Sequence, residues 1–466
     1  MIRKNKIKYF FFNIIKCQNY IKIFIILFII FFKICKNGTQ KTNFFYSYIK
    51  YKIYNRIKEK KIFNKNIKFG IYIISLSNGG RERITALLIN YLFKEKIFDI
   101  YLFTRKNKSN SEYKIPNNIH RIIISGSKDL KKKLINNKID IFIYQSYNIK
   151  EIEMLNKLNT VKTIFYNHSS FLFWIYFNKT FLIKKLYNEY KKSKYIISLI
   201  PFENDYLFKK WGINSILMNN FITYNYDEIT PSNLTTNIIL MIGRAYDKMK
   251  RFYLGIDAMK YIVKEVPDCK MIIISGFFGT KYLMDYVEKL NLKKNIKFVG
   301  FTLNPEKYYQ NASLHIFPSI IECFPMVLSE TKVYGIPNII VGIDYVSAAK
   351  DGVININNDS SENIAKESIK ILKNINYRKQ LGISARKSMK QYKNELTLKK
   401  WVELILAVYN GDYYYNKLRE NNKKLSEIQA INQLENQLKL MKKRLPITKN
   451  ISINDILNFN FINKFK

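Results

Sequence analysis

The chain has 466 residues, of which 47% are hydrophobic and 15% are aromatic. This length excludes a single small module, and this apolar content excludes a chain that is disordered throughout. The formal net charge is +44, because the chain has 79 Lys and Arg residues but only 35 Asp and Glu residues. Such an excess favours anionic partners. The basic residues are spread along the whole chain, however, and no Arg-rich helix or basic motif interleaved with aromatic residues indicates nucleic acid.

The cysteines and histidines give no sign of a metal or redox site. Cys17, Cys35, Cys269 and Cys323 lack the two-residue spacing of zinc or dithiol motifs. Cysteines this far apart are no disulfide framework either, which fits a reducing compartment. The three histidines are equally scattered. We therefore predict no metal site.

Residues 1–36 form a basic and hydrophobic segment. Its apolar run, Ile23 to Phe32, is ten residues long and ends at Lys33. A membrane-spanning helix needs about 20 apolar residues, so this run spans a bilayer only if Lys22 and Lys33 extend to the membrane surfaces. We expect a membrane-associated segment, either in-plane or a signal anchor, on an anionic cytoplasmic face. The alternative is an over-hydrophobic tail that results from the compositional bias. Residues 37–67 read as a linker.

Residues 68–222 alternate between strand and helix patterns. Phe69 to Ile74 is a short β-branched and aromatic run, and it is followed by a turn with Gly79 and Gly80 and then by a helical pattern from Ile84 to Leu92. Similar apolar runs recur at Ile100–Phe103, Ile122–Ile124, Ile139–Tyr144, Thr163–Tyr166 and Tyr195–Ile200. This alternation predicts a parallel sheet with helices on both faces. Turn-forming residues over 223–236 predict an interdomain linker.

Residues 237–394 repeat the pattern. Strand-like runs stand at Ile238–Ile242, Met271–Ser275, Ile296–Val299, Leu314–Phe317 and Asn338–Val341. The predicted fold class is therefore α/β, with two Rossmann-like, doubly wound domains that face a cleft. In such sheets, ligands bind beyond the carboxyl ends of the strands. Residues 395–412 predict a helix that crosses back to the first domain, and 413–466 a polar helical tail. Its short heptad pattern favours an appended surface helix over a coiled coil.

Two carboxylates, Glu322 and Glu330, stand eight positions apart after a predicted strand. If a helix begins near Phe324, Glu322 lies at its N-terminus, where free backbone N–H groups attract a phosphate or sugar oxygens. Glu330 then projects beside the same cleft and is suited to a vicinal diol such as a ribose. The alternative interpretation is a helix cap and a solvated helix carboxylate.

Arg244 and Lys250 follow the first strand of the second domain. Two cations at this edge suit a diphosphate leaving group; the alternative is a solvated basic loop. In the first domain, Gly79 and Gly80 permit close approach of the backbone. His168 ends a predicted strand at a point from which it reaches into the cleft.

Together, these motifs resemble those of the retaining, nucleotide-sugar-dependent group 1 (family four) glycosyltransferases, which have the GT-B fold. The likeness covers residues 68–411 and follows the family's order. It consists of the glycine turn Gly79-Gly80-Arg81-Glu82-Arg83, the segment Asn220-Phe221-Ile222, the pair Arg244 and Lys250 at a spacing of six, and the pair Glu322 and Glu330.

The resemblance implies roles for these residues. Arg244 and Lys250 would hold the donor diphosphate, Glu330 the ribose and Glu322 the hydroxyls of the transferred sugar, with His168 near the anomeric centre. The resemblance thus makes His168 and Glu322 the catalytic pair, and adds Gly79 and Gly80 to the donor site. Backbone N–H groups would come from Phe324, Met326 and Val327, since Pro325 has none. Cys323 stands where many members have Gly, which bears on donor choice.

The predicted function is the transfer of a sugar from a nucleoside-diphosphate donor to a glycan or lipid-linked acceptor, in polysaccharide biosynthesis. The resemblance implies retention of configuration. We expect no metal or further cofactor, because fixed cations stabilise the leaving group. The catalytic domains are expected on the cytoplasmic side of a membrane, without nucleic acid as a partner. The alternatives are a sugar-nucleotide epimerase or a phosphorylase of the same fold, and a catalytically silent basic scaffold that binds membranes.

Overall fold

The computed structural model describes residues 66–77, 79–109, 111–177, 180–276, 279–302, 304–421, 425–445 and 449–458. The predicted membrane segment, residues 1–36, lies outside these ranges, as does most of the predicted linker, residues 37–67. Within the ranges, no helix combines the length and the apolar character that crossing a bilayer requires.

The first domain is built on a seven-stranded parallel sheet with the strand order β3-β2-β1-β4-β5-β6-β7. Its central strands are buried on both faces because helices cover both sides, which explains their continuous apolar sequences. The strands are β1 (Ile67–Tyr72), β2 (Phe98–Thr104), β3 (His120–Ile123), β4 (Ile141–Tyr144), β5 (Lys162–Tyr166), β6 (Tyr195–Ser198) and β7 (Ser215–Leu217).

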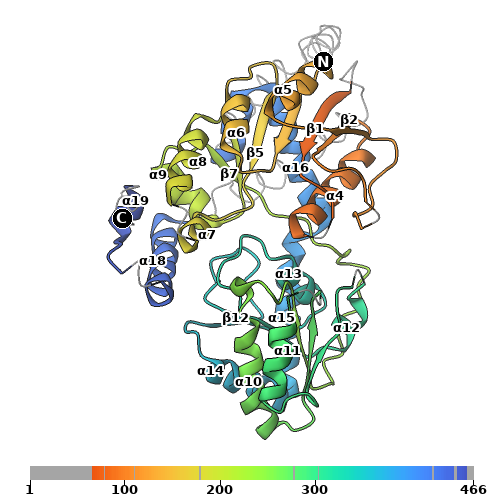
Figure 1. Ribbon diagram of the computed structural model, residues 1–466, viewed down its shortest axis with the longest axis vertical. Helices are drawn as coiled ribbons and strands as arrows, with labels where there is room; N and C mark the ends of the chain where they lie inside the picture. The colour runs from red at the N-terminus through yellow and green to blue at the C-terminus, as the bar shows by residue number, and fades with distance from the viewer. Residues whose placement is uncertain are drawn as a thin grey trace, which may run out of the picture. The chain divides into compact units, whose positions relative to one another are not determined.

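The helices of this domain begin at the turns that follow the strands (Figure 1). Asn148 and Ser170 cap two of them, since their side chains accept the N–H groups of Glu151 and Leu172. The elements are α4 (Gly80–Lys94), α5 (Ser127–Asn136), α6 (Ile149–Asn156), α7 (Phe171–Tyr176), α8 (Thr180–Lys192), the π-helix η1 (Glu203–Leu207) and α9 (Phe208–Lys210).

The second domain has a six-stranded parallel sheet in the order β10-β9-β8-β11-β12-β13. The strands are β8 (Ile238–Ile242), β9 (Lys270–Ile274), β10 (Ile296–Phe298), β11 (Leu314–Phe317), β12 (Asn338–Val341) and β13 (Val353–Ile356). The helices are the 3₁₀ turn η2 (Lys248–Lys250), α10 (Phe252–Glu265), α11 (Lys281–Lys289), α12 (Glu306–Asn311), α13 (Met326–Val333), α14 (Ser361–Lys373), α15 (Ile375–Ser388) and the 3₁₀ turn η3 (Met389–Tyr392). Two parallel α/β sheets confirm the predicted fold class. The edge strands β7 and β13 were not predicted.

Helix α16 (Asn394–Asn410) packs against the first domain, although it follows the second in sequence. The ring of Trp401 meets that of Tyr166 edge-on, with 5.2 Å between centroids. The ammonium group of Lys162 donates to the carbonyl of Tyr409 over 2.7 Å. In α17 (Asp412–Glu420), the buried hydroxyl of Tyr415 lies 3.2 Å from the backbone nitrogen of Ile196. These contacts anchor α16 and α17 to the first domain.

The tail helices α18 (Glu427–Arg444) and α19 (Ile453–Leu457) contact both domains. On the first domain, the N–H of Leu425 donates to Asp205 over 2.8 Å, and the indole of Trp211 donates to the carbonyl of Ile456 over 3.0 Å. On the second domain, Gln437 donates to the carbonyl of Gly342 over 3.0 Å. The predicted surface helix is therefore a packed one. Its apolar stripe is buried within the chain: Leu434, Leu438 and Met441.

Candidate functional site

Two helix N-termini, one from each domain, meet at the carboxyl ends of the sheets. A Cβ atom built on Gly80, the first residue of α4, would lie 3.7 Å from the Cγ atom of Met326, the first residue of α13. First-turn N–H groups have no partner within their own helix, and the helix dipole is positive there. The contact therefore creates a position suited to an anion, with N–H groups of Met326 and Val327 at one side.

The start of α13 differs slightly from the prediction. The helix begins at Met326, with Pro325 as its N-cap residue and no side-chain cap, rather than near Phe324. Proline has no N–H group and fixes its own backbone, so it fits this position. Glu322 and Phe324 consequently lie in the loop before the helix.

Gly79 leaves room for the carboxylate of Glu82 at the start of α4. Its backbone is extended, and a Cβ atom built on it would lie only 2.1 Å from Oε2 of Glu82. Glu82 stands in the first helical turn, where a carboxylate is favourable, and it pairs with Arg81 at 3.1 Å. A larger residue in place of Gly79 would displace this carboxylate.

Lys250 and Glu322 form an ion pair in front of α13. The ammonium group of Lys250 donates to Oε1 of Glu322, and the two side chains are only 18% and 14% exposed. The hydroxyl of Tyr345 bonds both the N–H and the carbonyl of Glu322, at 3.0 and 2.9 Å. The two predicted residues are thus together, and the backbone of Glu322 is held in place.

Arg244 is not part of this contact. It lies on the same loop as Lys250, but its side chain is 62% exposed and pairs with Asp247 at 3.0 Å. Asp247 also accepts the N–H of Met249 and so caps η2. Arg244 therefore flanks the Lys250–Glu322 pair without touching it.

Glu330, one turn into α13, is almost fully buried and has three partners. Its Oε1 accepts Arg83 Nη1 at 3.0 Å and Thr223 Oγ1 at 2.5 Å, and its Oε2 accepts the hydroxyl of Tyr309 at 2.6 Å. Burial by itself lowers the pKa of Arg83, but the charge of Glu330 and of nearby tyrosines outweighs it, and the pKa is raised. The alternative interpretation of Glu330 as a solvated helix carboxylate is wrong.

The partners of Glu330 were missed by the sequence analysis. Arg83 is the last residue of the glycine-turn motif, and Thr223 directly follows the segment from Asn220 to Ile222. Their places in or beside these motifs could have indicated that both belong to the site. Tyr309, in α12, had no such indication. The three come from the first domain, the linker and the second domain, so Glu330 ties all three segments together.

His168 follows β5 and is held by Gln145. The side-chain nitrogen of Gln145 donates to Thr85 over 2.9 Å and lies 3.3 Å from the carbonyl of Tyr72, so its oxygen faces His168 Nε2 at 2.7 Å. His168 Nε2 is therefore the donor, which leaves Nδ1 unprotonated. Burial lowers the pKa of His168 well below its usual value, and the charge of Arg81 adds to this. Among the described residues, no hydrogen bond joins His168 to Glu322 or Lys250.

Cys323 and Glu203 lie where the loop before α13 meets the first domain. Burial raises the pKa of the Cys323 thiol well above its usual value, and the charge of Glu203 acts in the same direction. Glu203 is itself 1% exposed: its Oε1 accepts from Ser170 and from the N–H of Phe171, and no described residue donates a hydrogen bond to its Oε2. Burial raises the pKa of Glu203 from 4.5 to about 8, against the effect of its two hydrogen bonds.

We expect the substitution Glu203→Gln to flatten the pH dependence of stability. Because the pKa of Glu203 is raised on folding, the folded state binds more protons than the unfolded state between about pH 4.5 and 8. Stability should fall over this window by up to about 1.4 kcal/mol per pH unit, and the amide removes this loss. The difference in melting temperature between variant and parent should grow from pH 5 to 8 and then level off. The exposed Glu435→Gln is the control, and parallel curves for Glu203→Gln and the parent would contradict the prediction.

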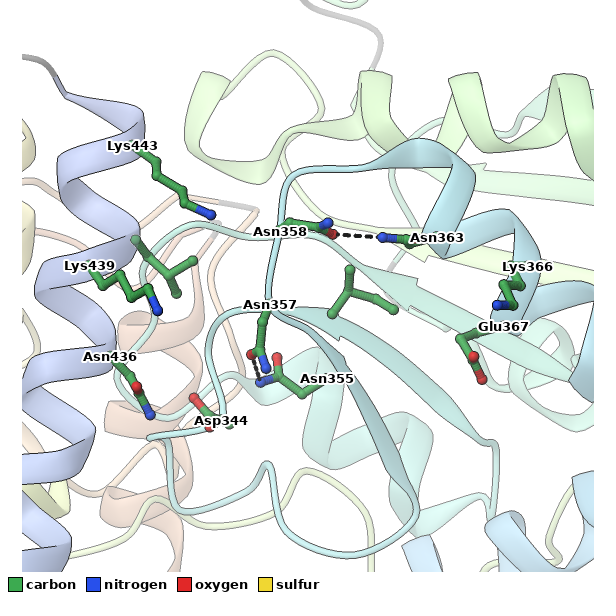
Figure 2. A pocket seen from close by; sticks show the side chains of 12 residues that line it. Asp344, Asn355, Asn357, Asn358, Asn363, Lys366, Glu367, Asn436, Lys439 and Lys443 are labelled. Atoms are coloured by element: carbon green, nitrogen blue, oxygen red, sulfur yellow. Dashed lines mark hydrogen bonds between the residues drawn. The ribbon is translucent and has the colours of Figure 1, made fainter.

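A cavity of about 530 Å³ lies away from these residues, between α18 and the corner that joins β13 to α14. Figure 2 shows Lys439 and Lys443 of α18 on one side of it and Lys366 on the other, with several asparagines between them. None of the predicted site residues lines this cavity, so it is separate from the candidate site.

Comparison with solved structures supports the GT-B architecture. A sucrose-phosphate synthase from Thermosynechococcus elongatus superposes with a TM-score of 0.63 at 14% identity, covering 74% of this chain and 100% of that one. A structure of Anabaena Alr3699/HepE in complex with UDP and glucose gives 0.59 at 13% identity, covering 73% and 100%. The family model "Glycosyl transferases group 1" matches residues 224–388, which include Arg244, Lys250, Glu322 and Glu330. The second domain therefore matches the group 1 glycosyltransferases.

Two proteins that are similar to this chain come from Campylobacter jejuni. One is named GalNAc-alpha-(1->4)-GalNAc-alpha-(1->3)-diNAcBac-PP-undecaprenol alpha-1,4-N-acetyl-D-galactosaminyltransferase; it is 25% identical over 376 residues, which is 74% of this chain and all of that enzyme. The other, named N-acetylgalactosamine-N,N'-diacetylbacillosaminyl-diphospho-undecaprenol 4-alpha-N-acetylgalactosaminyltransferase, is 26% identical over 299 residues, covering 57% and 78%.

Proposed function

We propose that this glycosyltransferase moves a sugar from a nucleoside-diphosphate donor to a lipid-linked glycan, with retention of configuration and without a metal ion. The observation that carries the proposal is the Lys250–Glu322 ion pair in front of the uncapped N-terminus of α13, where α4 of the first domain also begins. The acceptor class follows the two Campylobacter enzymes, whose names specify undecaprenyl-diphosphate-linked glycans.

Lys250, Arg244 and the N-termini of α4 and α13 can stabilise a diphosphate as it leaves the sugar. Negative charge develops on the leaving group as the bond to the sugar breaks, and preorganised positive groups stabilise it. Lys250 is fixed by Glu322, while Arg244 is free to turn from Asp247 toward the donor. Donor binding then replaces the Lys250–Glu322 contact with bonds from Lys250 to phosphate and from Glu322 to sugar hydroxyls.

Glu330 fits one ribose hydroxyl rather than two. A carboxylate has about four acceptor positions. Oε1 already accepts from Arg83 and Thr223, and among the described residues Oε2 accepts from Tyr309 alone. One position on Oε2 therefore remains for the ribose. His168, neutral and with Nδ1 unprotonated, is suited to hydrogen-bond a sugar hydroxyl rather than to carry charge.

The test is to incubate the protein with a panel of nucleotide sugars and a polyprenyl-diphosphate-linked glycan. We expect release of a nucleoside diphosphate that depends on the acceptor, is unchanged by EDTA, and yields by NMR a product with the anomeric configuration of the donor. Isomerisation of the donor without an acceptor would indicate an epimerase, and phosphate-dependent cleavage a phosphorylase. No turnover of any donor would favour the binding scaffold.

We also propose that residues 1–36 hold the enzyme on the cytoplasmic face of a membrane, near its lipid-linked acceptor. The basic and apolar character of that segment supports this. Protein lacking these residues should remain in the supernatant when membranes are sedimented and should still act on a water-soluble acceptor. Continued sedimentation with membranes would point to the body of the protein instead.

A further inference from the structure

A second cavity, of about 490 Å³, lies beside the loop that carries Arg244 and Lys250. It opens where α10 and α11 begin and reaches α7 of the first domain, which supplies Tyr176. The rest of its aromatic wall belongs to the second domain and includes Tyr246, Tyr253 and Tyr282. The cavity therefore touches both domains and the proposed diphosphate loop.

Three tyrosines of the cavity wall are strongly exposed to solvent. Tyr246 and Tyr253 are each 45% exposed and Tyr282 is 53% exposed. Large aromatic side chains that gather at a surface, rather than standing singly, commonly mark binding sites. The hydroxyl of Tyr282 donates to the carbonyl of Ala245 over 3.0 Å, which fixes its ring against the loop. Part of this aromatic surface is thus positioned before any ligand binds.

The polar groups of the cavity complement these rings. Asp247 and Lys248 lie on the loop between Arg244 and Lys250 and line the same cavity. Ligand sites typically combine aromatic walls with a few polar groups that fix orientation. A pyranose has the matching surface, because its C–H face stacks on an aromatic ring while its hydroxyls point outward to hydrogen-bonding groups. We infer that this cavity binds a sugar ring of the acceptor glycan, an assignment that rests on the proposed function.

The position of the cavity argues for acceptor rather than donor. In the proposed function, the nucleoside lies at Glu330, whose partners come from α4, α12 and the linker. None of those partners lines the cavity, which is formed by α7, α10, α11, the loop that carries Arg244 and Lys250, and Ile320 of the loop before α13. The transferred sugar lies at Glu322. The acceptor glycan approaches the reacting sugar along the loop that carries Arg244 and Lys250. It is therefore the ligand that fits this cavity.

The experiment measures saccharide binding directly, by saturation-transfer NMR with an alkyl glycoside of an N-acetylgalactosamine disaccharide and no donor. Tyr253→Ala and Tyr282→Ala should each weaken binding about tenfold, because a stacked ring is lost. Tyr253→Phe, which keeps the ring, should retain most of the binding. Tyr413→Ala, at a 70% exposed tyrosine on α17, is the matched control and should bind as the parent does.

Kinetics with the lipid-linked acceptor provide the second readout. The same alanine variants should raise KM for the acceptor about tenfold and leave KM for the donor unchanged. Equal saccharide binding by Tyr253→Ala, Tyr282→Ala and the parent, or no binding by the parent, would overturn the assignment. A rise in donor KM alone would overturn it too, by indicating a nucleoside pocket. Saccharide binding that is lost in the variants, in a protein that turns over no donor, would refute the proposed transfer but not this site.

Discussion

Replacing Lys250 with alanine is expected to reduce kcat at least about 100-fold, with the fold intact. The ammonium group pairs with Glu322, in the loop that leads into α13, and in the proposed function it turns from Glu322 to the departing diphosphate. Removing one preorganised group that faces developing charge typically costs about 100- to 1000-fold in rate. The loss should appear in kcat more than in donor KM, because the charge on the leaving group is greatest in the transition state. Steady-state rates with saturating acceptor provide the measurement.

The matched control for Lys250→Ala is Lys264→Ala, an exposed lysine in the last turn of α10. Its loss removes the same charge from the same domain and should leave turnover unchanged. Circular dichroism and the melting temperature should show that both variants are folded. A folded Lys250→Ala variant with parental turnover would remove Lys250 from the reaction.

Glu330→Ala should weaken both donor binding and the fold. The substitution leaves Arg83 without its carboxylate, and an unpaired charge in a largely buried position destabilises strongly. The Arg83 side chain is still 24% exposed, so water compensates for part of the lost partner. We therefore expect the free energy of unfolding to fall by about 2–3 kcal/mol, less than for a fully buried ion pair. Urea denaturation checks this value, and binding of nucleoside diphosphates checks the ribose contact.

The isosteric change Glu330→Gln separates these two effects. The amide oxygen still accepts from Arg83 and Thr223, whereas the amide nitrogen cannot accept from Tyr309 or a ribose hydroxyl. A folded Glu330→Gln variant with donor affinity reduced about tenfold supports the ribose contact. Combining Arg83→Met with Glu330→Ala should cost less than the sum of the single changes. Strict additivity would show that the two side chains act independently.

Much of the fold was readable from local pattern, because parallel strands covered on both faces are continuous apolar runs. The runs that predicted β8, β11 and β12 agree with the observed bounds. The edge strands β7 and β13 were not predicted from the sequence because they are short. In addition, three of the four residues of β13 are only partly buried. Their pairing is decided by the neighbouring strand rather than by their own sequence.

The candidate site was predicted less completely than the fold. Spacing placed Lys250 and Glu322 on adjacent loops, and the structure joins them. The spacing of motifs along the sequence did not reveal that Arg83, from the other domain, forms an ion pair with Glu330. These two positions are 247 residues apart. Nor did the spacing reveal the hydrogen bond from His168 to Gln145, which depends on the order of β4 and β5 in the sheet.

The tail helix α18 reaches the basic loop through a chain of charges. Its Arg444 pairs with Asp359 at 2.8 Å, and the same carboxylate pairs with Arg251, the neighbour of Lys250. Arg251 is buried, has a left-handed backbone (φ 47°), and donates to the carbonyl of Pro318 at 2.6 Å. Shortening the protein after α17 would therefore remove Arg444 and leave Asp359 with only one of these two cationic partners, Arg251, which directly follows Lys250 in the chain. Anyone trimming this enzyme for crystallisation should keep the chain through Arg444.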